Sequence, residues 1–244
     1  MKRVDNRQND ELRPLKFTCG FAKNADCSVL VELGNTKVLV TAMLEEKVPQ
    51  FLEGSNKGWL TAEYSLLPGS TKPRNTREVT KGKPTGRTSE IQRLIGRSLR
   101  AAFDLNALGP RTIAIDADVI NADASTRVAG ICGGYVAVYN AISKLKDQGL
   151  ISKIPLIEPV AAVSVGIVNG EVLLDLSYSE DSKAEVDCNV VMNKSGNLIE
   201  LQMTAEGKPF NPDLTDRVIK VANKGINEII KKQIEVTEQI LAIK

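Results

Sequence analysis

The stretch that decides the fold is TIAIDADVINADASTRVAGICGGYVAVYNAISKL, which covers residues 112–145. Its first part, Thr112–Ile120, predicts a β-strand. Its last part, Ser125–Leu145, is apolar on nearly every side, which is typical of a helix buried at the centre of a fold. The segment Asp123–Arg127 joins the two. We therefore expect a strand, a short turn and a central helix, with the other elements packed around them.

Turn sequences on both sides of this stretch predict β-hairpins. In each hairpin, two β-rich runs flank a turn that contains glycine. The predicted hairpins pair Cys27–Glu32 with Lys37–Met43 around Gly34-Asn35, Val160–Val168 with Glu171–Leu176 around Asn169-Gly170, and Glu185–Met192 with Asn197–Met203 around Lys194-Ser195-Gly196.

One further long helix is expected in each half of the chain. Ser89 and Gln92 have the spacing of a capping box, and apolar residues follow them at helical intervals up to Phe103. The last helix is expected to have Asn211 as its N-cap and Pro212 at its first position. Each half thus runs from strands into a long helix. The expected fold class is α/β, with two similar halves of β-sheet packed with helices.

The boundary between the halves is expected near residues 147–158, which contain Gly149 and Pro155 and are followed directly by Pro159. The N-terminal half, residues 1–150, then holds the Asp123–Arg127 junction and a basic loop. The C-terminal half, residues 151–244, holds an acidic cluster and the terminal helix.

The composition limits the possible functions. Of the 244 residues, 42% are hydrophobic and 25% are charged, which is ordinary for a globular protein. The net charge is only +2, so an RNA-binding surface has to be a local patch. The 4 cysteines form no C-x-x-C pair, so we expect free thiols and no zinc knuckle. The absence of histidine excludes Ser–His and Cys–His nucleophiles and a histidine-liganded metal.

Neither a signal peptide nor a membrane-spanning run is recognisable in the sequence. The N-terminal residues are polar and charged, and the best apolar candidate, Ile154–Val168, is interrupted by Pro155, Glu158 and Pro159. Together with free thiols, this predicts a cytoplasmic protein with no membrane attachment.

The junction Asp123–Arg127 is a candidate anion site. A strand–turn–helix junction directs several unpaired backbone N–H groups toward one point, where the helix dipole adds positive potential. Ser125 and Thr126 add hydroxyl donors, and Arg127 adds a full charge. The alternative is that Ser125 or Asp123 is an ordinary N-cap.

Arg87 is a second candidate contact for phosphate. It stands between Gly86 and Thr88 before the Ser89 helix, and an arginine beside a glycine at a helix start can bind phosphate in a bidentate manner. The alternative is a solvated surface arginine.

The segment 70–87 has the composition of a mobile basic loop, with 6 basic residues against 1 acid. Lys72, Arg74 and Arg77 within it are candidates for neutralising RNA phosphates, which would make binding depend on salt. The alternative is a flexible loop that is only exposed to solvent.

Asp181 and Asp187 belong to an acidic cluster with Asp175, Glu180 and Glu185. Asp187 falls inside an apolar run, where a carboxylate is costly unless it is paired, hydrogen-bonded or bound to a metal. Paired carboxylates can hold magnesium or protonate a departing oxygen in phosphoryl transfer. The alternative is a structural salt bridge to a lysine or an arginine.

Four segments, taken together, resemble the bacterial RNase PH family. They are DELRP at Asp10–Pro14, LTAEY at Leu60–Tyr64, GRTSEIQRLIGR at Gly86–Arg97 and EDSKAEVD at Glu180–Asp187. The long run at Gly86–Arg97 is highly specific, and the resemblance extends over nearly the whole chain.

The resemblance implies a phosphorolytic 3′→5′ exoribonuclease that trims tRNA 3′ ends, releases nucleoside diphosphates and can add nucleotides in reverse. It implies inorganic phosphate as co-substrate, magnesium as helper ion, tRNA precursors and other RNA 3′ ends as partners, and a homo-hexamer built as a trimer of dimers. The implied site residues are Arg87, Ser125, Thr126 and Arg127 for phosphate, Asp181 and Asp187 for catalysis and metal, and Lys72, Arg74 and Arg77 for RNA.

The chain departs from the family's usual pattern at three places. Ala124 and Ser125 stand where the family usually has two glycines, which would serve a positive φ or a close approach of phosphate. Val128 stands where threonine is common, and Met203 where glycine is common. None of these changes removes a group that the resemblance assigns to catalysis.

Two other functions compete with this expectation. One is a ring subunit that binds RNA and is catalytically silent, against which the joint presence of two arginines and two aspartates argues. The other is a hydrolase that uses water, and it would release monophosphates without needing inorganic phosphate.

Overall fold

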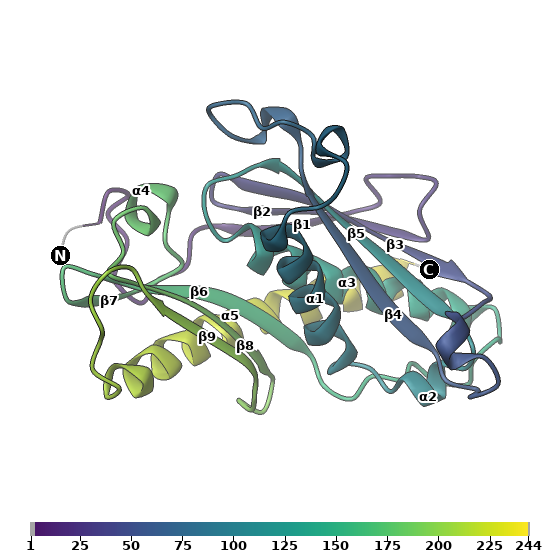
Figure 1. Cartoon of the computed structure of the whole chain (residues 1–244). Coiled ribbons are helices and arrows are strands. Elements are labelled where there is room, and N and C mark those ends of the chain that lie inside the picture. Colours follow the sequence, from purple (N-terminus) through teal and green to yellow (C-terminus); the bar gives the residue numbers. More distant parts are fainter. Residues whose placement is uncertain (1–2, 244) are drawn as a thin grey trace.

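The computed structural model describes residues 3–243, which form two β-sheets and five α-helices (Figure 1). The first sheet comes from the N-terminal half of the chain. Its order is β1-β2-β3-β5-β4, and its neighbours are antiparallel except for the parallel pair β4 and β5. The strands are β1 (Leu15–Cys19), β2 (Cys27–Leu33), β3 (Thr36–Glu45), β4 (Trp59–Leu66) and β5 (Thr112–Asn121).

The second sheet is antiparallel throughout, in the order β7-β6-β8-β9. Its strands are β6 (Val160–Val168), β7 (Glu171–Leu174), β8 (Val186–Asn193) and β9 (Leu198–Ala205). Ser164 pairs with Asn189, and Asn189 pairs with Gln202. Because side chains alternate along a strand, Asp187 shares the face of these three residues.

The helices cover and separate the two sheets. α1 (Gly86–Arg100) packs on β4, and α5 (Leu214–Ile243) packs on β6, β7 and β8. The remaining helices are α3 (Thr126–Asp147) and the single turns α2 (Leu105–Leu108) and α4 (Tyr178–Asp181). Short 3-10 turns lie at Gln50–Leu52, Pro68–Ser70 and Glu78–Lys81. Within residues 3–243, no helix is both long and apolar enough to cross a bilayer.

α3 is the central helix that the sequence predicts. It contacts β2, β3 and β5 of one sheet, β6 of the other, and both α1 and α5. Two glycines permit this close packing. A Cβ on Gly133 would overlap the Cγ2 atom of Val31, and a Cβ on Gly134 would lie 2.7 Å from Cδ1 of Leu99. The helix can therefore approach the first sheet and α1 more closely than alanine would allow.

The three predicted hairpins are confirmed, each within a few residues of its expected ends. At the tip of the β6–β7 hairpin, Asn169 and Gly170 have φ values of +50° and +75°. Two successive positive φ values are what a two-residue hairpin turn requires, and asparagine and glycine adopt them readily. The predicted α/β fold class is confirmed as well.

The predicted capping box at Ser89 and Gln92 is wrong. α1 begins at Gly86, and its N-cap is Thr85, whose side chain accepts a hydrogen bond from the Thr88 N–H. Ser89 already donates its N–H to the carbonyl of Thr85 and is inside the helix. The acidic partner comes from the preceding loop, where Glu78 accepts hydrogen bonds from Thr85 and Thr88.

The start of the last helix lies slightly later than predicted. Asn211 Oδ1 accepts the Asp213 N–H at 3.0 Å, and the carbonyls of Asn211 and Pro212 accept the next two N–H groups. These bonds form a turn that leads into α5 at Leu214. Asn211 thus stabilises the entry to the helix from outside its assigned bounds.

The main hydrophobic core runs from the first sheet through α3 to the second sheet, and a small second cluster lies at Val168, Leu173, Leu176 and Ala184. The segment before β1 crosses to the second half, where Leu174 donates its N–H to Asn9 and Lys224 pairs with Asp10. The boundary expected between residues 150 and 151 falls in the connection from α3 to β6. The division into two domains stays a prediction.

Candidate active site

A pocket of about 750 Å³ opens where the start of α3 faces α4 and β8. Its wall brings together residues from distant parts of the chain. The predicted phosphate ligands and the predicted catalytic acids all line it: Arg87, Ser125, Thr126, Arg127, Asp181 and Asp187. The two arginines and the two aspartates, which come from four different elements, therefore share one cavity.

The turn before α3 has an unusual backbone. Ala124 and Ser125 have φ values of +56° and +54°, in the left-handed region that non-glycine residues rarely adopt. Thr36 holds this turn from β3: its hydroxyl is 2.9 Å from the Asp123 carbonyl and 2.7 Å from the Ala124 carbonyl. The positive φ values occur at the two positions where glycines are expected, and here neither residue is glycine.

Ser125 occupies the N-cap position of α3 with a left-handed backbone, but neither its side chain nor that of Asp123 caps the helix, so the alternative of an ordinary N-cap is wrong. The Ser125 hydroxyl lies 2.7 Å from that of Ser164 and 3.1 Å from Oδ1 of Asp175. The carboxylate of Asp123 accepts hydrogen bonds from the Tyr178 N–H and the Asn35 amide. Among residues 3–243, no side chain caps α3. The first N–H groups of the helix stay available to an anion at the pocket wall.

Thr126, the first residue of α3, is fixed by a buried tyrosine. The hydroxyls of Thr126 and Tyr64 are 2.7 Å apart. Burial raises the pKa of Tyr64, although the hydrogen bond to Thr126 and the charges of Arg87 and Arg127 act in the opposite direction. Tyr64 therefore remains a neutral hydroxyl, and it connects β4 to the start of α3.

The two arginines of the pocket differ in their surroundings. Arg127 is only 14% exposed, and its Nη1 atom lies 3.4 Å from both Glu90 Oε2 and Gln202 Oε1. Arg87 is exposed in the first turn of α1, and within residues 3–243 it forms no ion pair. Both guanidinium groups thus keep donors for a ligand in the pocket.

Apart from the exposed Glu185, the acidic cluster divides into two kinds of carboxylate. Asp175 and Glu180 are buried and form ion pairs with arginines. Asp181 and Asp187 line the pocket, and in the part of the chain that the structure describes neither has a cationic partner within 4.0 Å. The salt-bridge alternative therefore holds for Asp175 and Glu180 and is wrong for Asp181 and Asp187.

Burial makes ionisation of these two acids unfavourable. It raises the pKa of Asp181, and the charge of Asp187 raises it further, while Arg87 and Arg127 oppose both effects. Burial also raises the pKa of Asp187, against the attraction of Arg127. Two acids with raised pKa values in one cavity are suited to binding a cation or exchanging a proton.

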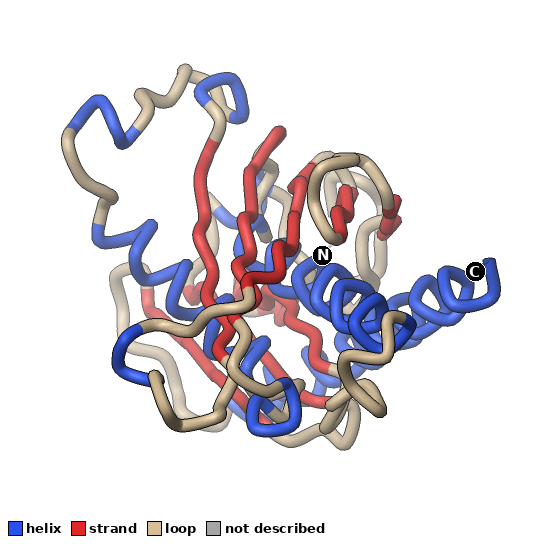
Figure 2. The backbone as a smooth tube through the Cα atoms, turned by 90° about the vertical axis from the view of Figure 1, so that its right-hand side faces the viewer, coloured by secondary structure: helices blue, strands red, loops and turns tan. Residues whose placement is uncertain are grey.

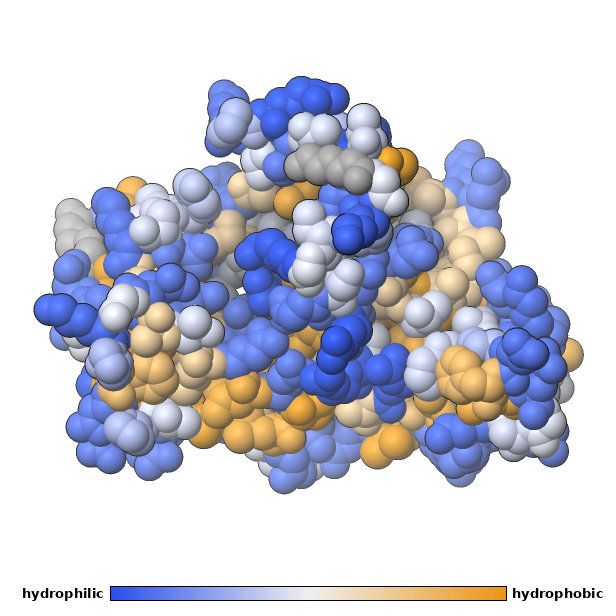
Figure 3. All heavy atoms as spheres, in the orientation of Figure 1, coloured by the Kyte–Doolittle hydropathy of each residue, from blue (hydrophilic) through white to orange (hydrophobic). Residues whose placement is uncertain are grey.

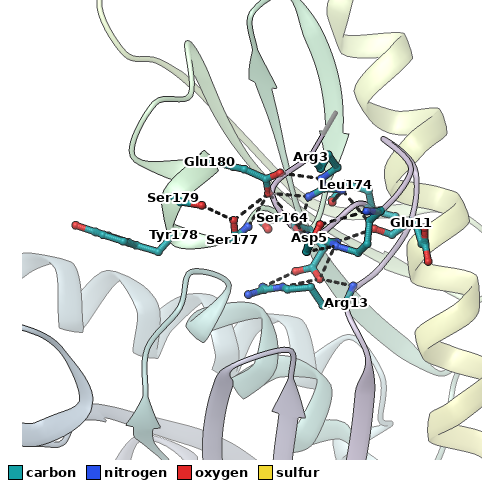
Figure 4. A network of polar contacts seen from close by, with 12 residues as sticks. Arg3, Asp5, Glu11, Arg13, Ser164, Leu174, Ser177, Tyr178, Ser179 and Glu180 are labelled. Carbon is teal, nitrogen blue, oxygen red and sulfur yellow. Dashed lines mark hydrogen bonds and ion pairs between the residues drawn. The ribbon is translucent and has the colours of Figure 1, made fainter. Parts of the chain in front are cut away.

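A network of N-terminal arginines, shown in Figure 4, binds Asp123, Asp175 and Glu180, which lie in or next to the pocket wall. Arg13 forms two hydrogen bonds with the carboxylate of Asp175, at 2.6 and 2.9 Å, and donates to the Asp123 carbonyl at 2.6 Å. Arg3 binds both carboxylate oxygens of Glu180 at 2.8 Å. Burial disfavours ionisation of Glu180, but the hydrogen bonds from Arg3 and Ser177 outweigh it and lower its pKa.

This network was not predicted from the sequence. Arg13 lies in the DELRP segment, which carries part of the family resemblance and was the available signal. Nothing in the local pattern indicates that Arg13 reaches Asp175, because the two residues are 162 positions apart. Ser164 and Asn189 also line the pocket without having been predicted.

The basic loop between β4 and α1 projects from the body of the molecule, as Figure 2 shows. In Figure 3 its surface is predominantly hydrophilic. Lys72 lines the pocket, whereas Arg74 and Arg77 are exposed farther along the loop and do not line it. Only one of the three predicted RNA contacts is therefore part of the pocket wall.

The donor set is compatible with magnesium. No group of three or more carboxylate or cysteine side chains that could enclose a metal occurs between residues 3 and 243. Magnesium usually binds one or two protein carboxylates and keeps its other positions for water and substrate phosphates. Asp181 and Asp187, two carboxylates without cationic partners at an open cavity, fit that requirement.

Comparisons with known proteins show the family and the fold of the chain. Models of domains 1 and 2 of the 3′ exoribonuclease family match residues 11–143 and 158–225. The Ribonuclease PH of Syntrophomonas wolfei is 55% identical over 233 residues, which is 96% of this chain and 98% of that protein. The Ribonuclease PH of Corynebacterium kroppenstedtii is 52% identical over 96% of this chain and 92% of that protein. An Archaeoglobus fulgidus exosome, solved with RNA bound to the active site, shares the fold with a TM-score of 0.80 at 22% identity, over 95% of this chain and 92% of that chain.

Proposed function

Because this chain belongs to the 3′ exoribonuclease family that includes Ribonuclease PH, we propose that its pocket shortens RNA from the 3′ end with inorganic phosphate as the attacking group. The observation that carries this proposal is the single cavity shared by Arg87, Arg127, Asp181 and Asp187. The enzyme is a phosphorolytic exoribonuclease, and a silent RNA-binding subunit is not favoured.

The first task of the pocket is to bring two anions together. Inorganic phosphate and the terminal phosphodiester repel each other, and a water-poor cavity strengthens that repulsion. Arg87, Arg127 and the uncapped N–H groups of α3 would offset it and hold phosphate in line with the last linkage. The hydroxyls of Ser125 and Thr126 would add hydrogen bonds. Most of the rate enhancement would then come from positioning and charge stabilisation.

The chemical step is a displacement at phosphorus. An oxygen of inorganic phosphate forms a bond to the terminal phosphorus, and the bond from that phosphorus to the 3′ oxygen of the preceding nucleotide breaks. The departing 3′ oxygen takes up a proton, and a nucleoside diphosphate is released. The phosphoanhydride retains much of the bond energy, so an excess of nucleoside diphosphate should drive nucleotide addition.

Asp181 and Asp187 are the groups placed to assist the departing oxygen. Their raised pKa values favour a proton at one carboxyl, which could serve the 3′ oxygen directly. Ionised, the pair would instead hold magnesium, which supplies a positive charge for the phosphate oxygens. Proton donation and magnesium binding both require Asp181 and Asp187 in this cavity.

The proposals on RNA substrates, assembly and location rest on the family and on the exposed cations of the basic loop. We propose tRNA precursors as the main RNA substrates, with Lys72, Arg74 and Arg77 binding RNA phosphates, and a homo-hexamer as the working assembly. A cytoplasmic location is supported by the four free cysteines, which suit a reducing compartment.

The experiment that tests the proposal uses a tRNA precursor with a 3′ extension. With inorganic phosphate, the protein should shorten the extension and release nucleoside diphosphates. Without phosphate, it should release nothing. Release of nucleoside monophosphates in both conditions would identify a hydrolase and refute the proposal.

Arg127→Ala should lower the phosphate-dependent rate roughly 100- to 1,000-fold, the loss expected when one preorganised donor to a developing charge is removed. RNA binding should change little, because the exposed loop remains. Arg93→Ala, which removes an exposed arginine of α1 outside the pocket, is the matched control. Equal rates for Arg127→Ala and Arg93→Ala would exclude Arg127 as a phosphate ligand.

A further inference from the structure

Tyr178, the first residue of α4, is an aromatic side chain exposed at the mouth of the pocket. Its side chain belongs to the wall of the pocket and also to that of a neighbouring hollow formed with Asn35, Asp123 and Ser177. The residue is 64% exposed. Tyr178 therefore lines both hollows and is accessible to a flexible ligand that leaves the pocket.

The backbone of Tyr178 is fixed although its ring is free. Its N–H donates to Oδ1 of Asp123 at 2.8 Å. The other oxygen of Asp123 accepts the Asn35 amide at 3.1 Å and lies 3.7 Å from Nη1 of Arg13. Figure 4 shows the ring of Tyr178 extending away from this network. A ring on a rigid support loses little conformational entropy when it binds a flat partner.

Tyr178 is also the available aromatic residue of the pocket wall. Tyr64, the other aromatic residue that lines the pocket, is 4% exposed, and its hydroxyl is bound to Thr126. The exposed cations Lys37, Lys72 and Arg87 line the same cavity as Tyr178. Cations beside an exposed ring form the combination by which proteins hold single-stranded nucleic acid: charge for the backbone and a stacking surface for a base.

We infer that Tyr178 stacks on a nucleobase within the last two nucleotides of the RNA 3′ end. Asp181 lies three residues later in α4, and the Cβ atoms of helical residues with that spacing are about 5–6 Å apart. Tyr178 and a carboxylate of the reacting centre are thus carried by the same helical turn. Stacking accepts every base, so it would position the 3′ end without selecting a sequence.

The inference rests on the proposed function, and it is tested with single-stranded RNA whose terminal or penultimate base has been removed. On intact RNA, Tyr178→Ala should lower kcat/KM for RNA roughly 10- to 100-fold, the loss that corresponds to one stacked base. The KM for inorganic phosphate should not change. On RNA that lacks the stacked base, Tyr178→Ala and the unmodified enzyme should have the same kcat/KM.

Control variants separate stacking from other roles. Tyr178→Phe and Tyr178→Trp should retain activity, because they keep a ring. Phe21→Ala removes an aromatic side chain that is 56% exposed and is not part of the pocket wall, and it should have no effect. The inference is overturned if Tyr178→Ala matches the unmodified enzyme on intact RNA, or if its loss is equal on every abasic RNA. Failure of the proposed function is distinct, since the unmodified enzyme would then release no nucleoside diphosphate.

Discussion

Burial gives Asp181 and Asp187 pKa values above the usual 3.8 of an aspartate. The folded chain therefore holds these protons more tightly than the unfolded chain does. The free energy of unfolding falls as the pH rises from about 4 through the raised pKa values, since charging the two acids then costs more in the folded state. At neutral pH these residues reduce stability, which is common for groups that serve chemistry.

Asp187→Asn removes one of the two charges and should raise the melting temperature at neutral pH, measured without divalent cations. It should also lower the pKa of Asp181, because the charge of Asp187 raises that pKa. The gain in melting temperature should shrink as the pH falls and vanish only well below pH 3.8, where both acids are protonated in the folded and unfolded states. Catalysis should be lost at every pH. A variant that is no more stable than the unmodified protein at neutral pH would contradict this assignment.

The left-handed backbone at Ala124 gives a second prediction for a single residue. Its φ of +56° is disfavoured for alanine by about 1–2 kcal/mol, whereas glycine adopts it freely. Ala124→Gly should therefore raise the free energy of unfolding by about 0.5 kcal/mol, after subtraction of the extra entropy that glycine gives the unfolded chain.

Urea denaturation measures this change, with Ala122→Gly as the control two residues earlier. Ala122 is not among the residues with positive φ, so glycine there should only destabilise. If both variants lose stability by the same amount, the strain at Ala124 is not relieved by glycine.

At the scale of elements, α3 owes its position to glycines that no hydrophobic pattern identifies. A methyl group on Gly133 would overlap Val31, and the surrounding core has no free space to receive it. Gly133→Ala should lower the free energy of unfolding by about 1–3 kcal/mol, the usual cost of overpacking.

A double-mutant cycle tests this packing. Val31→Ala creates space beside Gly133, so the combination of both changes should be less destabilising than the sum of the two single changes. Strict additivity would show that the two side chains do not meet in the folded protein.

The sequence predicted elements well wherever a local pattern defines them. The hairpins at Gly34-Asn35 and Asn169-Gly170 were predictable because their turns demand particular residues. The start of α1 was misplaced because the acidic partner of its N-cap is Glu78, in the preceding loop. A capping box places that partner three residues after the N-cap. Contacts such as Arg13 with Asp175 could not be predicted, since they depend on how the two halves pack.

For the candidate site too, local patterns were predictable and long-range contacts were not. The residue types at Asp123–Arg127 and at Asp187 indicated anion binding and paired carboxylates, and the family resemblance placed them in one site. The pattern alone could not exclude N-caps and salt bridges. The structure decided both questions. The positive φ of Ser125 shows that it is not an ordinary N-cap, and the arginine partners of Asp175 show that this acid stabilises the fold, whereas Asp181 and Asp187 face the pocket.

At the scale of the whole molecule, the weak net charge of +2 means that RNA binding depends on local cations. If Lys72, Arg74 and Arg77 each neutralise one RNA phosphate, the triple alanine variant should reduce the slope of log affinity against log salt concentration by about 2. Filter binding of single-stranded RNA over a range of salt concentrations measures it. Lys16→Ala, an exposed cation on β1, should leave the slope unchanged. An unchanged slope for the triple variant would remove the loop from the RNA surface.

Labelled phosphate shows directly whether inorganic phosphate is the attacking group. The enzyme is incubated with unlabelled RNA and radiolabelled inorganic phosphate, and the products are separated. The label should appear in the terminal phosphoryl group of the released nucleoside diphosphates, and Arg127→Ala should slow its transfer roughly 100- to 1,000-fold. Unlabelled nucleoside monophosphates from the unmodified enzyme would show that water attacks, and the phosphate pocket would then have no role in the reaction.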